Sequence, residues 1–382
     1  MNNRDFIRQA PRTESSSNRS GSIWRFAHTD PPLLVGLILI CCFGLLVLYS
    51  ASDGNEIVVR RQALVMVVGI LAMFIVSQFN VHVFRSWALS MYGAGLALLA
   101  LVLIIGVEAG GARSWIDLPG IPSFQPSEIM KIVVPLMIAW YLGSRPLPPR
   151  FKHLFWSALM ILIPAVLIII QNDTGTAIMV MMSGLFVVLL AGIRWRIVIT
   201  GFLALLLASP AWYLFLAPEH IKSRILTVFN PYRDPTGAGY NIIQSQIAIG
   251  SGGVYGKGYG NGAQSHLDFI PESNTDFILA VLAEEFGLLG ILFLICLYLF
   301  ILLRSSYIAY SAKDMFSRLL AGSITLTFFI YVFVNMAMVS GLLPVIGLPL
   351  PLISRGGTAI VTFFVCFGLL MSIQTHGRLK ET

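Results

Sequence analysis

Ten apolar runs, each about long enough to cross a lipid bilayer, constrain the fold of this 382-residue chain more than any other feature. A helix needs about 20 mostly apolar residues to span the hydrocarbon core. The runs fall near residues 32–52, 62–79, 87–107, 126–143, 155–171, 176–193, 196–217, 277–303, 316–339 and 358–375. Backbone groups in lipid must bond within their own segment, and these runs do not alternate in polarity. Helices are therefore expected rather than a barrel.

Composition indicates the same class of protein, because 57% of the residues are hydrophobic and only 11% are charged. The expected fold is an all-α polytopic membrane protein with about ten transmembrane helices and a large extracytoplasmic loop between helices 7 and 8. We expect residues 32–377 to form a single membrane domain that contains this loop at 218–276. Residues 1–31 are predicted to be a disordered, basic cytoplasmic tail, and residues 378–382 a short cytoplasmic tail.

The distribution of Lys and Arg predicts the orientation, because cytoplasmic loops carry an excess of both. With both termini in the cytoplasm, 16 of the 25 basic residues fall on that side, eight fall outside, and Lys131 lies within a span. The cytoplasmic set is Arg4, Arg8, Arg12, Arg19, Arg25, Arg85, Arg145, Arg150, Lys152, Arg194, Arg196, Arg304, Lys313, Arg318, Arg378 and Lys380. The 218–276 loop is therefore expected to be extracytoplasmic.

Two other classes of function are not expected. The net charge of +7 would suggest nucleic-acid binding in a soluble protein, but here topology explains most of the excess. All four cysteines lie inside predicted spans, so no disulfide framework or thiolate metal site is expected.

The first of four polar elements on the predicted outer side joins Arg113 and Trp115 to Glu128 and Lys131. Glu128 and Lys131 are three residues apart on one helical face and can pair. The pair is either a structural device that spares each charge from lipid or part of a substrate site. Trp115 is either an interfacial anchor or a stacking platform for a sugar.

The second and third elements are a tight turn that contains Asp173 and the long loop at 218–276. Asp173 is either the cap of the next helix or a cavity-lining carboxylate. The loop has a glycine-rich stretch around Lys257, which suits either a close approach of backbone amides to phosphate or simple flexibility. The loop ends at Glu272 and Asp276, immediately before an apolar run.

Asp276 stands where a water-facing loop meets the hydrocarbon boundary, a position suited to chemistry on a substrate with a polar head and a lipid tail. The alternative is a helix cap. Glu284 and Glu285 follow about two to three turns into the span, where carboxylates are costly unless paired, protonated or facing a wet cavity. We expect a polar cleft here, with Asp276 catalytic and the two glutamates structural or cavity-lining.

The fourth element, at residues 341–357, is apolar and interrupted by prolines. Such a segment is typical of a re-entrant loop, which needs a covering of protein or a wet cavity at membrane depth. Arg355 would then place a cation near the same cleft.

Several motifs in this order resemble the SEDS family over nearly all of residues 30–377, and most of all its elongation-specific branch. The motifs are Gln125-Pro126-Ser127-Glu128, the run from Asp234 through Gly253, Thr275-Asp276-Phe277, Ala283-Glu284-Glu285 and Pro351-Leu352-Ile353-Ser354. The sequence departs from the family's pattern at Arg355, where Tyr is common, and at Asn274, where His is common. Asn172 and Thr174 also stand where Pro and Leu are common.

The resemblance implies a peptidoglycan glycosyltransferase of the bacterial cytoplasmic (inner) membrane that polymerises lipid II into glycan strands during cell-wall elongation and rod-shape maintenance. It implies a class B penicillin-binding protein as transpeptidase partner, together with other membrane proteins of the elongation complex. It also implies that Asp276 is the essential carboxylate. The motifs carry the family's Trp, Glu and Lys onto Trp115, Glu128 and Lys131.

In the mechanism expected from this resemblance, Asp276 is a general base that activates a sugar hydroxyl against a lipid-pyrophosphate donor. The candidate substrate-binding residues are Trp115, Arg113, Glu128, Lys131, Lys257, Glu272 and Arg355. No cofactor and no protein-bound metal is predicted with certainty, and a divalent cation held by the pyrophosphate is compatible with the sequence. The alternatives are a lipid II flippase and a structural scaffold for a cell-wall complex.

Overall fold

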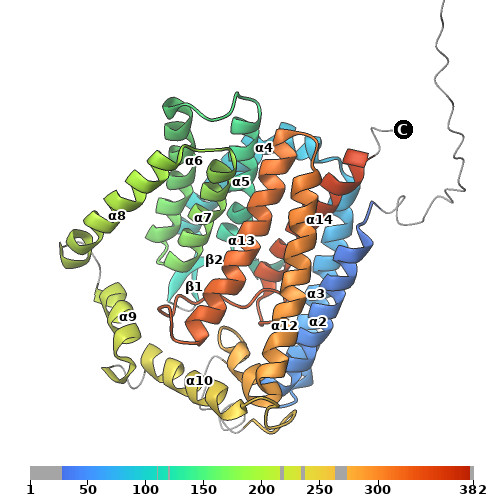
Figure 1. Cartoon of the computed structure of the whole chain (residues 1–382), viewed down its shortest axis with the longest axis vertical. Helices are drawn as coiled ribbons and strands as arrows, with labels where there is room; N and C mark the ends of the chain where they lie inside the picture. The colour runs from blue at the N-terminus through green and yellow to red at the C-terminus, as the bar shows by residue number, and fades with distance from the viewer. Residues whose placement is uncertain are drawn as a thin grey trace, which may run out of the picture.

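The described part of the chain is built almost entirely of helices (Figure 1). The computed structural model describes residues 28–109, 111–118, 121–215, 219–233, 237–262 and 273–378. Most of the predicted N-terminal tail and the residues from 379 onward lie outside the described residues.

Long helices stand at all ten predicted spans in the described chain. They are α2 (Pro31–Ala51), α3 (Glu56–Gln78), α4 (Val81–Ile105), α5 (Pro126–Gly143), α6 (Phe151–Ile170), α7 (Thr174–Leu190), α8 (Trp195–Phe215), α12 (Ile278–Ser311), α13 (Met315–Val339) and α14 (Gly357–Arg378). Among the described helices, eight are long and apolar enough to cross a membrane. The other two are α7, which is shorter, and α5, which carries Glu128 and Lys131. The chain is a polytopic membrane protein, and the exact number of spans stays a prediction.

The interior of the bundle is centred on α5, whose side chains are buried on nearly every face. This helix packs against α4, α7 and α13, while α14 packs along α3. In contrast, α8 diverges from the bundle in Figure 1, and none of its apolar window is buried. A helix that is apolar all round and unpacked suits contact with lipid.

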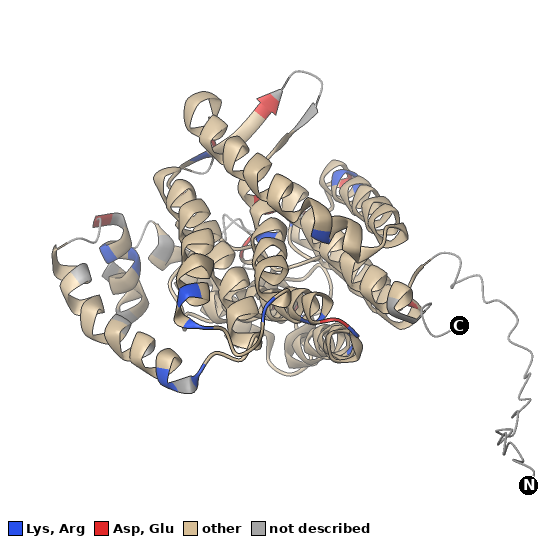
Figure 2. Cartoon of the chain, turned by 90° about the horizontal axis from the view of Figure 1, so that it is seen from above, with Lys and Arg blue, Asp and Glu red and all other residues tan. Residues whose placement is uncertain are grey.

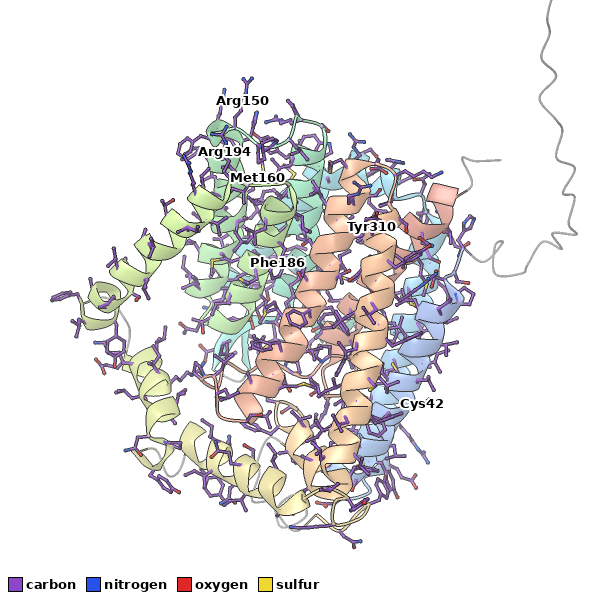
Figure 3. All side chains as sticks on the ribbon, in the orientation of Figure 1. Cys42, Arg150, Met160, Phe186, Arg194 and Tyr310 are labelled. Carbon is purple, nitrogen blue, oxygen red and sulfur yellow. The ribbon has the colours of Figure 1, made fainter. Side chains whose placement is uncertain are left out.

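The two ends of the bundle differ, because basic residues lie at one end and the helices of the long loop lie at the other. Seen from above, most of the ribbon is neither basic nor acidic (Figure 2). Figure 3 places Arg150 and Arg194 at the top end, whereas α9 (Glu219–Phe229) and α10 (Ala238–Gly252) lie at the bottom end in Figure 1. The long loop thus lies opposite these arginines, as the predicted orientation requires. Which end faces the cytoplasm stays a prediction.

One region departs from the all-helical expectation. A small antiparallel sheet follows α4, with strands β1 (Val107–Ala109), β2 (Ala112–Leu118) and β3 (Ile121–Phe124) in the order β1-β2-β3. The turn after β1 includes Gly111 at φ +80, which glycine adopts without steric cost. Strands β1 and β3 have only three and four residues, and the seven residues of β2 do not alternate strictly between polar and apolar, so the sequence pattern did not predict them.

The long loop between α8 and α12 is itself largely helical where it is described. Helices α9 and α10 are joined through a 3-10 turn at Pro231–Arg233, and α10 packs against α12 and α13. The apolar stretch at 242–249 belongs to α10, which explains its amphipathic pattern. These helices build one wall beside the bundle.

The segment between α13 and α14 is non-helical and largely buried from Leu348 to Ser354. Tyr298 on α12 donates its hydroxyl to the Pro351 carbonyl oxygen at 2.6 Å, and the Gln62 amide on α3 donates to the Ser354 carbonyl oxygen at 2.9 Å. The segment is therefore covered by protein and its backbone oxygens are partly satisfied by side chains, which is the condition that a re-entrant loop must meet.

Candidate active site

A cavity of about 520 Å³ opens between β2, α9 and the first turns of α5, α7 and α14. Six of the predicted site residues line it, namely Trp115, Glu128, Lys131, Asp173, Asp276 and Arg355. They come from segments far apart in the sequence, and the helical bundle brings them to one end of the molecule.

Glu128 and Lys131 form an ion pair in the wall of this cavity, with 2.5 Å between Lys131 Nζ and Glu128 Oε1. The side chains of Lys131 and Glu128 are only 6% and 7% exposed. The pairing follows from their spacing in α5, because residues three apart are neighbours on a helix. Each charge of the pair is neutralised by the other in apolar surroundings, and the pair also lines the cavity. The structural and the substrate-binding interpretations are therefore compatible.

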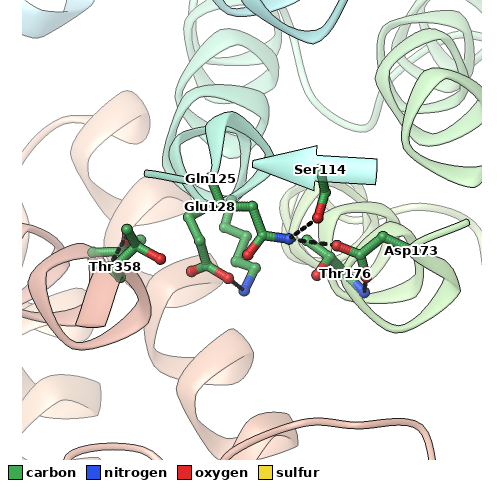
Figure 4. A network of polar contacts seen from close by, with 8 residues as sticks. Ser114, Gln125, Glu128, Asp173, Thr176 and Thr358 are labelled. Atoms are coloured by element: carbon green, nitrogen blue, oxygen red, sulfur yellow. Dashed lines mark hydrogen bonds and ion pairs between the residues drawn. The ribbon is translucent and has the colours of Figure 1, made fainter. Parts of the chain in front are cut away.

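Asp173 joins three segments at the start of α7 (Figure 4). Its Oδ1 accepts a hydrogen bond from the Thr176 N–H at 3.0 Å, which is the bond of a helix cap. Its Oδ2 accepts from the Gln125 amide at 2.5 Å, and Gln125 also donates to the Ser114 hydroxyl at 3.4 Å. Asp173 is therefore the predicted cap and a cavity residue at once, and it holds β2 and the start of α5 beside α7.

Asp276 is half-buried and lines the cavity immediately before α12. The capping position of α12 falls at Phe277, which makes no side-chain cap bond, and Asp276 stands one residue before it. The buried Asn335 on α13 donates its amide to the backbone oxygens of Asp276 and Leu348, at 2.9 and 2.7 Å. A Cβ at Gly347, whose φ is +76, would lie 3.6 Å from Asp276 Oδ2. The re-entrant segment is thus fixed against the Asp276 turn.

Three of the described cationic residues line the cavity: Lys131, Arg224 and Arg355. The Arg355 N–H donates to the Asn274 carbonyl oxygen at 2.9 Å, which places Arg355 beside the turn that carries Asp276. Within the described chain, neither arginine side chain is engaged in a hydrogen bond or an ion pair, so both can contact an anionic ligand. The same described residues contain no group of three or more His, Cys, Asp or Glu side chains arranged to hold a metal ion.

An apolar groove of about 490 Å³ adjoins the polar cavity. Aliphatic residues of α7, α9 and the segment after α13 line it, for example Ile178 and Ile221. Thr174, Arg224 and Ile346 line both spaces. A polar chamber and an apolar groove therefore meet at Arg224, as a ligand with a charged head and a hydrocarbon tail requires.

Arg113 is a predicted site residue that does not line the cavity. The Arg113 guanidinium donates to the carbonyl oxygens of Gly106 and Ile104 at 2.8 and 3.0 Å, and so satisfies the end of α4. Glu272 lies outside the described residues, and its substrate role stays a prediction.

Lys257, Glu284 and Glu285 form a second polar cluster, and none of them lines the cavity. Lys257 Nζ lies 2.6 Å from Glu284 Oε1, and the Ser50 hydroxyl on α2 donates to Glu285. The two glutamates are 0% and 1% exposed. Lys257 is thus an ion-pair partner that lies outside the cavity, and each buried glutamate has a protein partner. The substrate role of Lys257 and the structural role of the two glutamates stay predictions.

The glycine-rich turn after α10 explains how this second cluster is held. Helix α12 is broken at Gly287, where φ is +63 and ψ is −158. The Leu288 N–H donates instead to the Gly253 carbonyl oxygen at 3.0 Å. A Cβ at Gly256 would lie 2.0 Å from the Glu285 carbonyl oxygen, so only glycine permits this approach. These glycines serve backbone docking, a role that differs from both the flexibility and the phosphate binding considered from the sequence.

Sequence reasoning missed three residues of the site. Asn335 carried a readable signal, because an amide inside an apolar run needs partners. Arg224 carried a weaker one, since it follows the helical spacing of the apolar residues of α9. Thr358 faces Glu128 from α14 (Figure 4), and a lone threonine near a helix start carries no signal of its own.

The helical bundle, its polar cavity and the adjoining groove define a polytopic membrane protein with a chamber suited to an amphiphilic molecule. The chain matches the model of the FtsW, RodA and SpoVE family, described as cell cycle protein, over residues 32–379, and it belongs to that family. The resemblance stated from the sequence motifs is thereby confirmed.

Named relatives match nearly the whole chain. The peptidoglycan glycosyltransferase MrdB of Escherichia coli (strain K12) is 43% identical over 360 residues, which are 94% of this chain and 96% of MrdB. The probable peptidoglycan glycosyltransferase FtsW of Geobacter sp. (strain M18) is 34% identical over 91% of this chain and 97% of its own length.

Solved structures share the fold. One is a chain from a study of the structural coordination of polymerization and crosslinking by a peptidoglycan synthase complex; it has a TM-score of 0.81 and 32% identity and covers 91% of this chain and 98% of that one. The rod shape determining protein RodA of Thermus thermophilus has a TM-score of 0.70 and 28% identity and covers 91% of this chain and 97% of its own.

Proposed function

We propose that this protein is a peptidoglycan glycosyltransferase that polymerises lipid II into glycan strands during cell-wall elongation and rod-shape maintenance. The observation that carries the proposal is the cavity in which Asp276 stands with Lys131, Arg224 and Arg355, next to an apolar groove. Lipid II has a sugar head, an anionic pyrophosphate link and a hydrocarbon tail. These three parts match the polar chamber, its cations and the groove. The names of the relatives that match nearly the whole chain support the same activity.

Asp276 acts as the general base of the reaction. Its carboxylate takes the proton of an acceptor sugar hydroxyl while that oxygen attacks the anomeric carbon of the donor. The new glycosidic bond forms as the bond between the anomeric carbon and the pyrophosphate oxygen breaks, and the lipid pyrophosphate leaves as an anion. Because the transition state has oxocarbenium character, the protein must hold both substrates in line and stabilise the departing charge.

The cavity cations stabilise the charge that develops on the pyrophosphate. Arg224 and Arg355 suit this task because the guanidinium fork matches phosphate oxygens in a bidentate manner. Lys131 adds a fixed positive charge, since Glu128 holds its ammonium at 2.5 Å. Trp115 supplies an aromatic face to the same cavity, which suits stacking against a sugar ring.

The protein works in the bacterial cytoplasmic membrane with both termini inside, so that the cavity opens on the outer side where glycan strands are assembled. The placement of Arg150 and Arg194 at the opposite end of the bundle supports this orientation. A class B penicillin-binding protein acts as the transpeptidase partner, alongside other membrane proteins of the elongation complex. A similar chain comes from a complex in which polymerization and crosslinking are coordinated.

Purified protein and its candidate transpeptidase, incubated with lipid II, test the activity. Glycan strands are resolved on a gel, and labelled lipid II in vesicles reports translocation in a parallel sample. The proposal predicts strands. Translocation without strands would replace the enzyme with a flippase. The absence of both from a folded sample would leave the scaffold interpretation.

A further inference from the structure

A second, much smaller cavity of about 10 Å³ lies beside the Glu128–Lys131 pair, and we call it the inner chamber. Its size admits the centre of one water molecule. Residues of α5, α13 and α14 enclose it, with Thr327 and Tyr331 contributed by α13. Glu128 and Lys131 line both the inner chamber and the large cavity, so the ion pair forms the partition between the two.

Three oxygens of residues that line the inner chamber have no hydrogen-bond partner within the described chain. They are Glu128 Oε2, Thr327 Oγ1 and Tyr331 Oη. Their side chains are at most 8% exposed. An unpaired buried polar atom is costly, and most such atoms in proteins bond either to protein or to an ordered water. A buried water makes about three hydrogen bonds, and the residues that line this water-sized space carry three unpartnered oxygens.

We propose that the inner chamber is a water-binding site and that its water positions the Glu128–Lys131 pair for catalysis. The water donates its two protons to Glu128 Oε2 and Thr327 Oγ1 and accepts the proton of the Tyr331 hydroxyl. Tyr331 and Thr327 are thus positioning residues, because they act on the cavity only through the ion pair. Only the catalytic consequence of the site rests on the proposed glycosyltransferase function.

The geometry of Lys131 explains why such a site matters. Its Nζ lies 2.5 Å from Glu128 Oε1 and 4.7 Å from the centroid of the Tyr331 ring. A cation over an aromatic face is attracted to it, and more strongly where water is excluded. A carboxylate that is bonded through both oxygens cannot swing about its terminal torsion. The ammonium held by that carboxylate then keeps one direction toward the cavity.

A double-mutant cycle tests the proposal through strand synthesis. Tyr331→Phe keeps the ring beneath Lys131 and removes the hydroxyl, and Thr327→Val removes the other hydroxyl at nearly constant shape. Each change is expected to lower kcat about tenfold with KM for lipid II unchanged. Because both hydroxyls bind the same water, the double variant should also lose about tenfold rather than about a hundredfold.

Two buried hydroxyls elsewhere provide matched controls. The Tyr92 hydroxyl donates to the Met160 carbonyl oxygen, and the Thr325 hydroxyl donates to the Ala321 carbonyl oxygen. Neither residue lines the inner chamber. Tyr92→Phe and Thr325→Val should leave kcat unchanged, which separates a positioning role from a general loss of buried hydrogen bonds.

Other outcomes overturn the proposal. Losses that multiply in the double variant mean that the hydroxyls do not share a ligand, and an unchanged kcat in both single variants means that the chamber does not position the pair. If Tyr331→Phe does not fold, Thr327→Ser replaces it: serine keeps the hydroxyl and should restore the wild-type kcat, and a loss equal to that of Thr327→Val contradicts the water site.

A cryo-electron microscopy map of the wild-type protein, at a resolution that shows ordered water, tests the site without any substrate. The expected result is a peak within hydrogen-bond distance of Glu128 Oε2, Thr327 Oγ1 and Tyr331 Oη. An empty chamber in a map that shows other buried waters overturns the proposal. A peak in a protein that makes no strands supports the water site while removing the proposed function.

Discussion

Two kinds of carboxylate lie a few residues apart near the start of α12, and they have opposite surroundings. Asp276 lines a cavity of about 520 Å³ that also contains cationic side chains. Glu284 is fully buried against Lys257, and Glu285 accepts a hydrogen bond from Ser50. The sequence signal was the same in both cases, a carboxylate beside or within an apolar run. A carboxylate in a membrane protein therefore marks a site only where the surrounding backbone leaves it facing open space.

The largest effect that this comparison predicts is on catalysis. Asp276→Ala should lower the rate of strand synthesis about 1,000-fold, because general-base catalysis contributes about 100- to 10,000-fold. Thermal unfolding of the variant in detergent should stay close to wild type, since Asp276 is half-buried and faces a cavity. A loss of less than tenfold in a folded sample would mean that the cavity carboxylate is not the base.

Substitutions in the second polar cluster, Lys257 with Glu284 and Glu285, should lower stability rather than catalysis. Lys257→Met leaves Glu284 fully buried and without its ion-pair partner, which should lower the free energy of unfolding by about 3 kcal/mol. This value is the lower end of the range for a broken buried pair, because Lys257 is partly exposed. Thermal and denaturant unfolding measure the change. Adding Glu284→Gln should recover much of the loss. Equal stability of Lys257→Met and wild type would remove the distinction between the two clusters.

Arg355→Lys tests the contribution of a cavity cation to catalysis directly. Lysine keeps the charge but loses the planar fork, so kcat/KM for lipid II should fall about tenfold. Arg113→Lys is the matched control, because Arg113 bonds the end of α4 and does not line the cavity. Equal losses in the two variants would show that position in the cavity does not decide the effect.

The smallest effect is expected at an ion pair on the surface. Arg60 and Glu56 lie 2.7 Å apart on α3, with both side chains largely exposed. Glu56→Gln should change the free energy of unfolding by at most about 0.5 kcal/mol, because solvent screens such pairs. Comparison with Lys257→Met in the same unfolding assay then isolates the contribution of burial. A loss as large as that of Lys257→Met would show that burial is not the cause.

The long helices could be predicted from the sequence because the hydrophobic length of a span is a local property of the chain. Some residues of the cavity could be predicted for a related reason. Asp276 and Arg355 are charged residues at the ends of long apolar segments, and a charge stands out more clearly beside such a segment than in the mixed sequence of a soluble protein. The hairpin at β1 and β2 escaped prediction because its short strands follow directly on an apolar run.

The positions of Lys257 and Arg113 outside the cavity have one physical origin. A Lys or Arg side chain near a membrane boundary needs either an anionic ligand or an acceptor in the protein. The sequence does not distinguish the two cases, because the residue is the same in both. Glu284 is 27 residues away from Lys257, so only the fold shows that the two meet. Arg113 likewise serves backbone oxygens at the end of α4, a role that leaves no pattern in the sequence.

A paired assay of two charge-removing variants separates the two carboxylates. Asp276→Asn and Glu284→Gln each remove one negative charge at nearly constant shape, and each variant is assayed for the initial rate of glycan strand synthesis per folded molecule. We expect Asp276→Asn to make no strands above background and Glu284→Gln to retain a rate near wild type. Strand synthesis by Asp276→Asn at the wild-type rate would contradict the assignment of this cavity as the polymerising site with Asp276 as its base.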